Sequence, residues 1–167
     1  MPDRIVYRGF TVSYQEIVNE LISPIKFLPI LSADESNSKN PVDVDALWDT
    51  GAMVTCMKPS LWENLLIRPF DTSNRIELTG IGGSVKTLFT IANLFLAPNL
   101  LIEFCPVYIL DFPGNTDILI GMDIIGMGDF VVCNANNKTS FSFAIPPFPD
   151  RIDLVEKVDA ANKLTGD

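Results

Sequence analysis

Residues 46–56 read ALWDTGAMVTC, an apolar segment that runs directly into an aspartate. The preceding residues 42–48 alternate and then become continuously apolar, a pattern typical of a strand that enters a protein core. A carboxylate at the end of such a strand is costly to bury without a partner, because desolvation penalises its charged form. Asp49 therefore either caps a turn or stands beside a group that makes its burial useful.

Short apolar segments with Gly and Pro between them continue on both sides of this stretch. The pattern predicts strands within 4–14, 25–33, 42–49, 53–57, 75–98 and 100–110, with a polar turn at 34–41. An apolar segment with three glycines follows at 118–130, and residues 130–134 and 139–145 are expected to form a closing hairpin. Helical spacing predicts helices at 15–22, where Pro24 would end the helix, at 58–67, and in the tail at 150–166. Many short strands with this punctuation indicate an all-β barrel or sandwich with a few helices.

The composition excludes several function classes. The chain has 167 residues, 47% of them apolar, which is enough for the core of one domain. Its net charge of −9 provides no basic surface for nucleic acid or anionic lipid. The absence of histidine excludes Ser-His-Asp and Cys-His nucleophiles and His-ligated zinc. We expect no metal and no cofactor.

The cysteines and the hydropathy pattern predict where the protein works. The chain has three cysteines, Cys56, Cys105 and Cys133, which is an odd number, and their spacing is not that of a metal site. We therefore expect free core thiols in a reducing compartment, the cytoplasm. No apolar segment approaches the roughly 20 residues that a membrane-spanning helix needs. The N-terminus also lacks the pattern of a signal peptide.

Three motifs follow one another along the chain: DTGA at 49–52, GIGG at 80–83 and ILIGMDII at 118–125. Each alone has an ordinary explanation, as a turn, a hairpin tip or a core strand with a tight glycine. In this order and spacing they resemble the retropepsin-like aspartic proteases, the small dimeric relatives of pepsin. The resemblance covers residues 25–146.

The resemblance implies a fold and a domain organisation. The expected fold is an all-β, acid-protease β-barrel with a flap hairpin, one or two short helices and a C-terminal helical extension. A protease domain at 25–147 would lie between an N-terminal strand and helix extension at 1–24 and a helical tail at 148–167.

The resemblance also implies an activity, an aspartic endopeptidase that hydrolyses peptide bonds in a protein or peptide substrate. Because the chain has one Asp-Thr-Gly and pepsin-like chains have two, the second aspartate would come from a second copy in a homodimer. Two alternatives remain open: a catalytically silent peptide-binding or dimerisation module on the same fold, and an unrelated β-barrel with an incidental DTGA.

Roles carry over to individual residues. Asp49 would be the catalytic carboxylate, Thr50 would bond to the catalytic loop of the partner, and Gly51 would bind the substrate main chain. The residues expected to contact substrate are Ala52, Met53 and the flap residues Ile81, Gly82 and Gly83. Those expected to support the site from behind are Ile120, Gly121 and Met122, with Gly121 small enough for two chain segments to cross.

Four positions need a separate interpretation. Met53 and Met122 stand where retroviral members usually have an acidic residue and an arginine, so a contact between the two methionines could replace an ion pair and make the groove more apolar. We expect Asp123 to cap a short helix or bond local backbone. Trp48 could pack under the Asp49 loop or contribute to the dimer interface.

Overall fold

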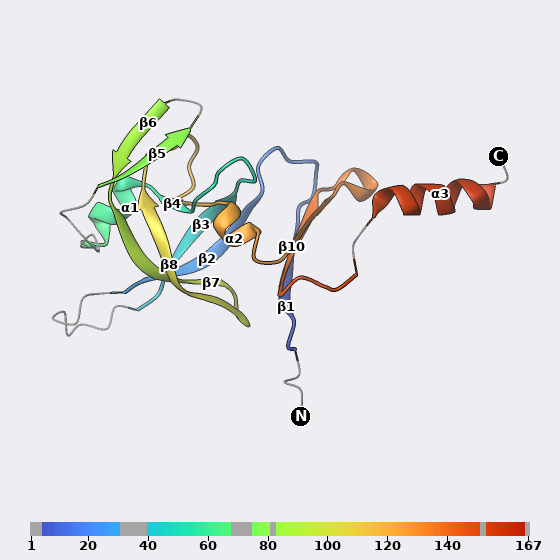
Figure 1. Ribbon diagram of the computed structural model, residues 1–167, viewed down its shortest axis with the longest axis horizontal. Helices are drawn as coiled ribbons and strands as arrows, with labels where there is room; N and C mark the ends of the chain where they lie inside the picture. The colour runs from blue at the N-terminus through green and yellow to red at the C-terminus, as the bar shows by residue number, and fades with distance from the viewer. Residues whose placement is uncertain (1–4, 31–39, 68–74, 81–82, 151–152, 166–167) are drawn as a thin grey trace.

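A closed barrel of six strands forms the main body of the chain (Figure 1). The computed structural model describes residues 5–30, 40–67, 75–80, 83–150 and 153–165. Around the barrel the strands follow in the order β2 (Ile22–Pro29), β3 (Val42–Trp48), β9 (Ile118–Ile120), β4 (Cys56–Met57), β8 (Leu100–Ile109) and β7 (Phe89–Ala97). The predicted β-barrel is therefore confirmed.

Strand β3 ends directly before Asp49, which lies at the edge of the barrel. Its inward side chains Val44, Ala46 and Trp48 are buried, whereas Asp43 and Asp45 are exposed. This alternation is expected of a strand with one face on the core and the other toward solvent. The two aspartates of β3 thus lie on a solvated face.

Strand β9 runs parallel to β3, and the two strands end side by side. Trp48 at the end of β3 pairs with Ile120 at the end of β9. All three residues of β9 are buried, as is typical of a parallel strand covered on both faces. Because parallel strands point the same way, the residues that follow them, Asp49 and Gly121, meet at one edge of the barrel.

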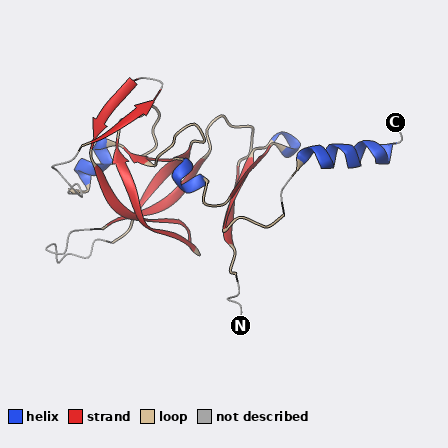
Figure 2. Ribbon diagram, in the orientation of Figure 1, coloured by secondary structure: helices blue, strands red, loops and turns tan. Residues whose placement is uncertain are grey.

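A second, three-stranded sheet packs beside the barrel (Figure 2). Its strand order is β1 (Arg8–Ser13), β11 (Ser140–Ile145) and β10 (Asp129–Cys133), all antiparallel. The hairpin predicted near the end of the β region is the β10–β11 pair. The first strand of the chain therefore shares a sheet with the last.

Trp48 joins the two sheets. Its ring is 4% exposed, stacks on Phe130 with 5.5 Å between centroids and lies 5.2 Å from the ring of Phe143. Its Nε1–H donates to Ser23 Oγ at 2.9 Å. Of the two positions that the sequence left open for Trp48, the structure gives packing within the chain, between the barrel and the three-stranded sheet.

The remaining elements are short apart from the last helix. Strands β5 (Ile76–Gly80) and β6 (Gly83–Thr87) form a hairpin that stands away from the barrel (Figure 1). Two helical turns, α1 (Pro59–Asn64) and α2 (Met122–Ile125), and a 3₁₀ turn, η1 (Ala135–Asn137), link strands. No helix in the described part of the chain is both long enough and apolar enough to cross a membrane.

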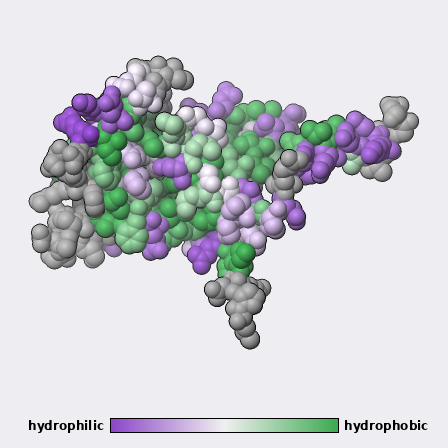
Figure 3. Space-filling view, viewed as in Figure 1, coloured by the Kyte–Doolittle hydropathy of each residue, from purple (hydrophilic) through white to green (hydrophobic). Residues whose placement is uncertain are grey.

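The predicted tail helix is present as α3 (Leu154–Thr165), which points away from the body of the molecule (Figure 1). Its apolar side chains Leu154, Val155 and Val158 are between 55% and 68% exposed. In the space-filling view the helix is mostly hydrophilic, with hydrophobic surface near its start (Figure 3). The division of the chain at residues 24 and 147 stays a prediction.

The helix predicted at 15–22 is wrong. Residues 15–21 form bends without helical structure, and β2 begins at Ile22. Their backbone groups bond to distant segments instead: Val18 N–H donates to Thr139 Oγ1 at 3.1 Å, and Leu21 C=O accepts from Trp48 N–H at 2.8 Å. Tertiary hydrogen bonds therefore replace the helix that the apolar spacing predicted.

The strand predicted at 53–57 is also shorter than expected. Only Cys56 and Met57 form β4, because residues 51–54 turn around the edge of the barrel. The polar turn predicted at 34–41 lies mostly outside the described residues.

The cysteines are free, but only two of them are core thiols. Cys56 and Cys105 are buried, whereas Cys133 at the end of β10 is exposed, so the prediction of a core position is wrong for Cys133. Burial, and secondarily the charge of Asp123, raises the pKa of Cys56 to about 11 and that of Cys105 to about 12. Both thiols are therefore neutral at physiological pH.

We expect the native protein to react with one equivalent of a thiol reagent at about pH 8, because only a thiolate is the nucleophile. Cys133 is accessible, whereas Cys56 and Cys105 form thiolates only as the pH rises toward their raised pKa values. Mass spectrometry after labelling would identify the modified position. Rapid native labelling of Cys56 or Cys105 would contradict this burial.

Candidate active site

The Asp49 loop is a tight turn held by its own backbone. Asp49 N–H donates to Ile120 C=O at 3.0 Å, and Ala52 N–H donates to Asp49 C=O at 3.2 Å. Gly51 N–H donates to Asp49 Oδ1 at 2.8 Å. The carboxylate is half-buried, and among the described residues no hydrogen bond reaches its other oxygen. One carboxylate oxygen is thus fixed by the loop while the other is available.

Gly121 lies where two chain segments cross behind this loop. A Cβ atom on Gly121 would stand 2.6 Å from both the carbonyl carbon and the carbonyl oxygen of Val54. Next to the crossing, Met122 N–H donates to Ala52 C=O at 2.8 Å and Asp123 N–H donates to Met53 C=O at 3.2 Å. The absence of a side chain at Gly121 permits this backbone approach.

Asp123 holds the end of the Asp49 loop by accepting hydrogen bonds from Thr55. Its carboxylate accepts from Thr55 Oγ1 at 2.8 Å and from Thr55 N–H at 2.9 Å, and Gly121 N–H donates to Thr55 Oγ1 at 3.2 Å. Thr55 is fully buried. The bond from Ile124 N–H to Asp123 Oδ1, 3.0 Å, is the local contact that the sequence predicted. The link to Thr55 was not predicted.

Asp123→Ala is expected to lower the free energy of unfolding by about 2–4 kcal/mol, because it leaves the buried hydroxyl and N–H of Thr55 without their acceptor. Chemical denaturation measures this change. Asp123→Asn keeps one acceptor oxygen and should lose less. Equal stability of the alanine variant and the wild type would contradict the role of Asp123 in holding the loop.

A groove lies between the Asp49 loop and the β5–β6 hairpin. Its volume is about 740 Å³. The residues that line it come from the loop, the hairpin, β4, β9 and the segment after β8: Gly51, Ala52, Met53, Val54, Cys56, Leu78, Thr79, Gly83, Ser84, Val85, Leu110, Asp111, Phe112, Pro113 and Leu119. Leu78, Asp111 and Phe112 are not among the site residues predicted from the sequence, because no motif marks them.

The predicted substrate residues divide into two groups. Ala52, Met53 and Gly83 line the groove, and Gly83 has a φ of +106°, which suits a hairpin tip. Ile81 and Gly82 lie outside the described residues.

The remaining predicted positions surround the Asp49 turn. Ile120 is buried and bonds the loop from behind, whereas Thr50 and Gly51 are exposed on the surface of the single chain. Met53 and Met122 are 70% and 42% exposed, so the contact expected between them stays a prediction. Their segments are joined through backbone hydrogen bonds.

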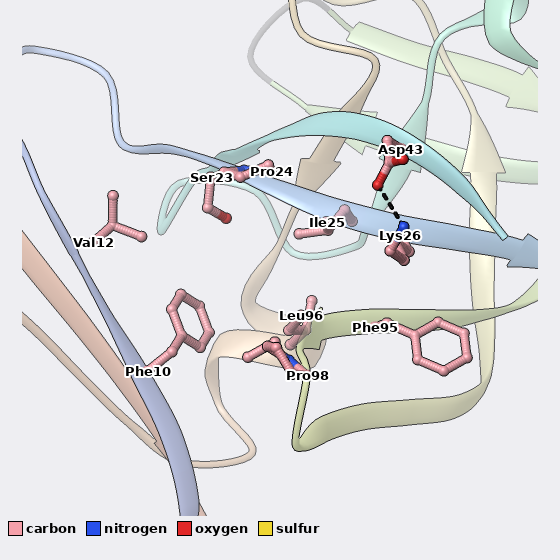
Figure 4. A pocket seen from close by; sticks show the side chains of 11 residues that line it. Phe10, Val12, Ser23, Pro24, Ile25, Lys26, Asp43, Phe95, Leu96 and Pro98 are labelled. Atoms are coloured by element: carbon pink, nitrogen blue, oxygen red, sulfur yellow. Dashed lines mark hydrogen bonds and ion pairs between the residues drawn. The ribbon is translucent and has the colours of Figure 1, made fainter.

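A second cavity, of about 420 Å³, lies between β1 and the barrel (Figure 4). Phe10 and Val12 of β1 face Ile25 and Leu96 across it, and the ion pair Lys26–Asp43, 2.8 Å, stands on one side. Its lining shares no residue with the groove and is almost entirely apolar. It is a space between packed layers, and the two charged side chains in its lining, Lys26 and Asp43, pair with each other.

The turn that carries the Asp49 carboxylate borders the groove through its residues Gly51, Ala52 and Met53. The described residues contain no cluster of three side chains that could hold a metal ion. The model of the aspartyl protease family matches residues 36–124, more than half of the chain. The chain therefore belongs to the aspartyl protease family, which confirms the relationship predicted from DTGA, GIGG and ILIGMDII.

Solved structures that resemble this one include a retropepsin-like aspartic protease from Rickettsia conorii. The sequences are 10% identical, the TM-score is 0.48, and the match covers 84% of this chain and 97% of that one. No curated protein matches the chain.

Proposed function

We propose that the protein is an aspartic endopeptidase whose active site forms across a homodimer from Asp49 and Asp49 of the partner subunit. The observation that carries the proposal is the single Asp49 turn, fixed by β3, β9 and Asp123 at the mouth of a groove. Membership of the aspartyl protease family supports a peptidase. Since the sequence holds one Asp-Thr-Gly, the second carboxylate has to come from a second chain.

The exposed side of the loop supports the dimer. Thr50 and Gly51 lie on the surface of the single chain, next to the half-buried carboxylate. In the proposed assembly a two-fold axis passes between the two Asp49 turns, and each Thr50 hydroxyl bonds to the facing loop. The β5–β6 hairpin, which lines the groove opposite the Asp49 turn, acts as a flap over bound substrate.

The proposed chemistry needs only the two carboxylates and water. Two carboxyl groups that face each other across the proposed two-fold axis share one proton, because two neighbouring carboxyl groups cannot both be ionised. The charged group removes a proton from water, whose oxygen attacks the peptide carbonyl carbon, while the neutral group donates its proton to the carbonyl oxygen. The resulting gem-diol collapses as the nitrogen is protonated and the C–N bond breaks, which yields a carboxylic acid and an amine.

Cleavage of a peptide library with and without pepstatin tests the proposal. We expect cleavage that pepstatin inhibits, and apolar residues favoured at the subsites adjoining Met53. A preference for charged residues at the subsites that adjoin Met53 would contradict an apolar surface there. Binding of peptides without any cleavage would favour a catalytically silent module on the same fold.

We propose the cytoplasm as the working location. The support is chemical: three cysteines without a disulfide, one of them exposed, suit a reducing compartment. The expected partners are a second copy of the chain and a protein or peptide substrate.

A further inference from the structure

We infer that Asp111 makes this groove selective for substrates with a lysine or arginine side chain at one subsite. The inference rests on the proposed function, since it concerns the same groove, and it adds a substrate class to it. Asp111 belongs to the segment after β8 and lines the groove together with Phe112 and Pro113.

Asp111 is the one charged side chain among the residues that line the described groove. The other titratable group in the lining is Cys56, whose pKa burial raises to about 11, so it carries no charge at neutral pH. The rest of the lining is apolar, glycine or hydroxyl-bearing. A single carboxylate in such a surface favours a cation and disfavours an anion.

No group of the described chain already neutralises this carboxylate. Asp111 is exposed and makes no hydrogen bond or ion pair with any described residue. The ammonium group of Lys58 interacts with other groups than Asp111. Its Nζ donates to Gly114 C=O and lies 5.2 Å from the centre of the Phe112 ring. A substrate cation would therefore meet an unpaired carboxylate.

The backbone around Asp111 is fixed, which gives the charge a defined place. Leu110 N–H donates to Met57 C=O at 3.0 Å, so the residue before Asp111 is tied to the end of β4. Lys58 holds the following turn through Gly114, and Lys58 N–H also donates to Asp117 C=O at 2.9 Å. A carboxylate in a fixed position can select a cation at one subsite, whereas a mobile carboxylate could pair with a substrate cation at several subsites.

Across the groove the polar groups of the hairpin are already engaged. Thr79 Oγ1 and Ser84 Oγ lie 2.8 Å apart and bond to each other. These hydroxyls carry no charge and offer nothing that would compete with Asp111 for an ammonium or guanidinium group. The two walls thus differ, with charge on the β8 side and neutral hydroxyls on the hairpin side.

The test is cleavage of peptides that differ at one subsite at a time, with Lys, Arg, Gln, Glu or norleucine at the varied position. At one subsite we expect the wild type to favour Lys and Arg over Gln by about three- to tenfold in kcat/KM, as a partly screened charge pair allows. Asp111→Asn should remove the preference, and Asp111→Lys should reverse it toward Glu. Asp45→Asn, a matched loss of an exposed carboxylate outside the groove, should leave it unchanged.

Binding of the same peptides to the Asp49→Asn protein, followed by fluorescence anisotropy, separates this inference from the proposed function. Cleavage without a basic preference, or a preference that survives Asp111→Asn, overturns the inference and leaves the protease intact. Absence of cleavage with Asp111-dependent binding of the lysine peptide overturns the protease and supports the inference. Absence of both cleavage and binding overturns both.

Discussion

Asp49→Asn is expected to lower kcat/KM by at least about a thousandfold, since it removes a group that transfers protons in the proposed reaction. An asparagine amide cannot take a proton from water or donate one to the carbonyl oxygen as a carboxyl group does. Its side-chain oxygen can still accept from Gly51 N–H, as Asp49 Oδ1 does at 2.8 Å, so the turn should survive. The measurement is the rate of peptide cleavage by purified wild type and variant.

A matched control separates lost chemistry from lost structure. Asp45→Asn changes an exposed aspartate four residues earlier on the outer face of β3, and we expect full activity. Circular dichroism and sedimentation should show both variants folded and assembled like the wild type. Cleavage by Asp49→Asn at the wild-type rate would refute the assigned role of Asp49.

Gly121→Ala is expected to destabilise the protein by about 3 kcal/mol or more and to abolish activity, as overpacking against backbone does. The added Cβ would lie 2.6 Å from the carbonyl carbon and oxygen of Val54. Backbone atoms cannot rotate aside, so either the Asp49 loop or the segment after β9 has to move. Thermal and chemical denaturation measure the loss of stability, and peptide cleavage measures the loss of activity.

Gly114→Ala is the control for the general effect of removing a glycine. A Cβ there meets nothing within 4 Å, although its φ of +93° disfavours a side chain. We expect a loss of about 1–2 kcal/mol with activity retained, since the strain is confined to one exposed turn. Equal stability of Gly121→Ala and the wild type would contradict a close crossing behind Asp49.

The sequence predicted the parts of the fold that depend on strong local patterns. The alternation of residues 42–48 predicted a strand that enters the core, and β3 is that strand, because a strand with one buried face leaves little freedom of register. The helix predicted at 15–22 failed for the opposite reason. Its apolar spacing is a weak signal, and hydrogen bonds from distant residues such as Thr139 outweighed it.

The candidate site was predictable in its motifs but not in its supports. The resemblance to the retropepsin-like aspartic proteases predicted that the ILIG segment lies behind the DTGA turn. In the structure the parallel pairing of β3 with β9 brings the two segments together. The link between Thr55 and Asp123 spans 68 positions and follows no local pattern. Asp111 also gave no signal, because a single aspartate in a turn is common and its position in a groove depends on the whole barrel.

Subunit mixing tests the central claim, a site shared between two chains, most directly. Wild type and Asp49→Asn are mixed in equal amounts at constant total protein, allowed to exchange subunits, and assayed for peptide cleavage. Random pairing leaves two intact aspartates in about one quarter of the dimers, so activity should fall to about one quarter of that of pure wild type. A fall to about one half would mean that each chain acts alone and would contradict the shared site.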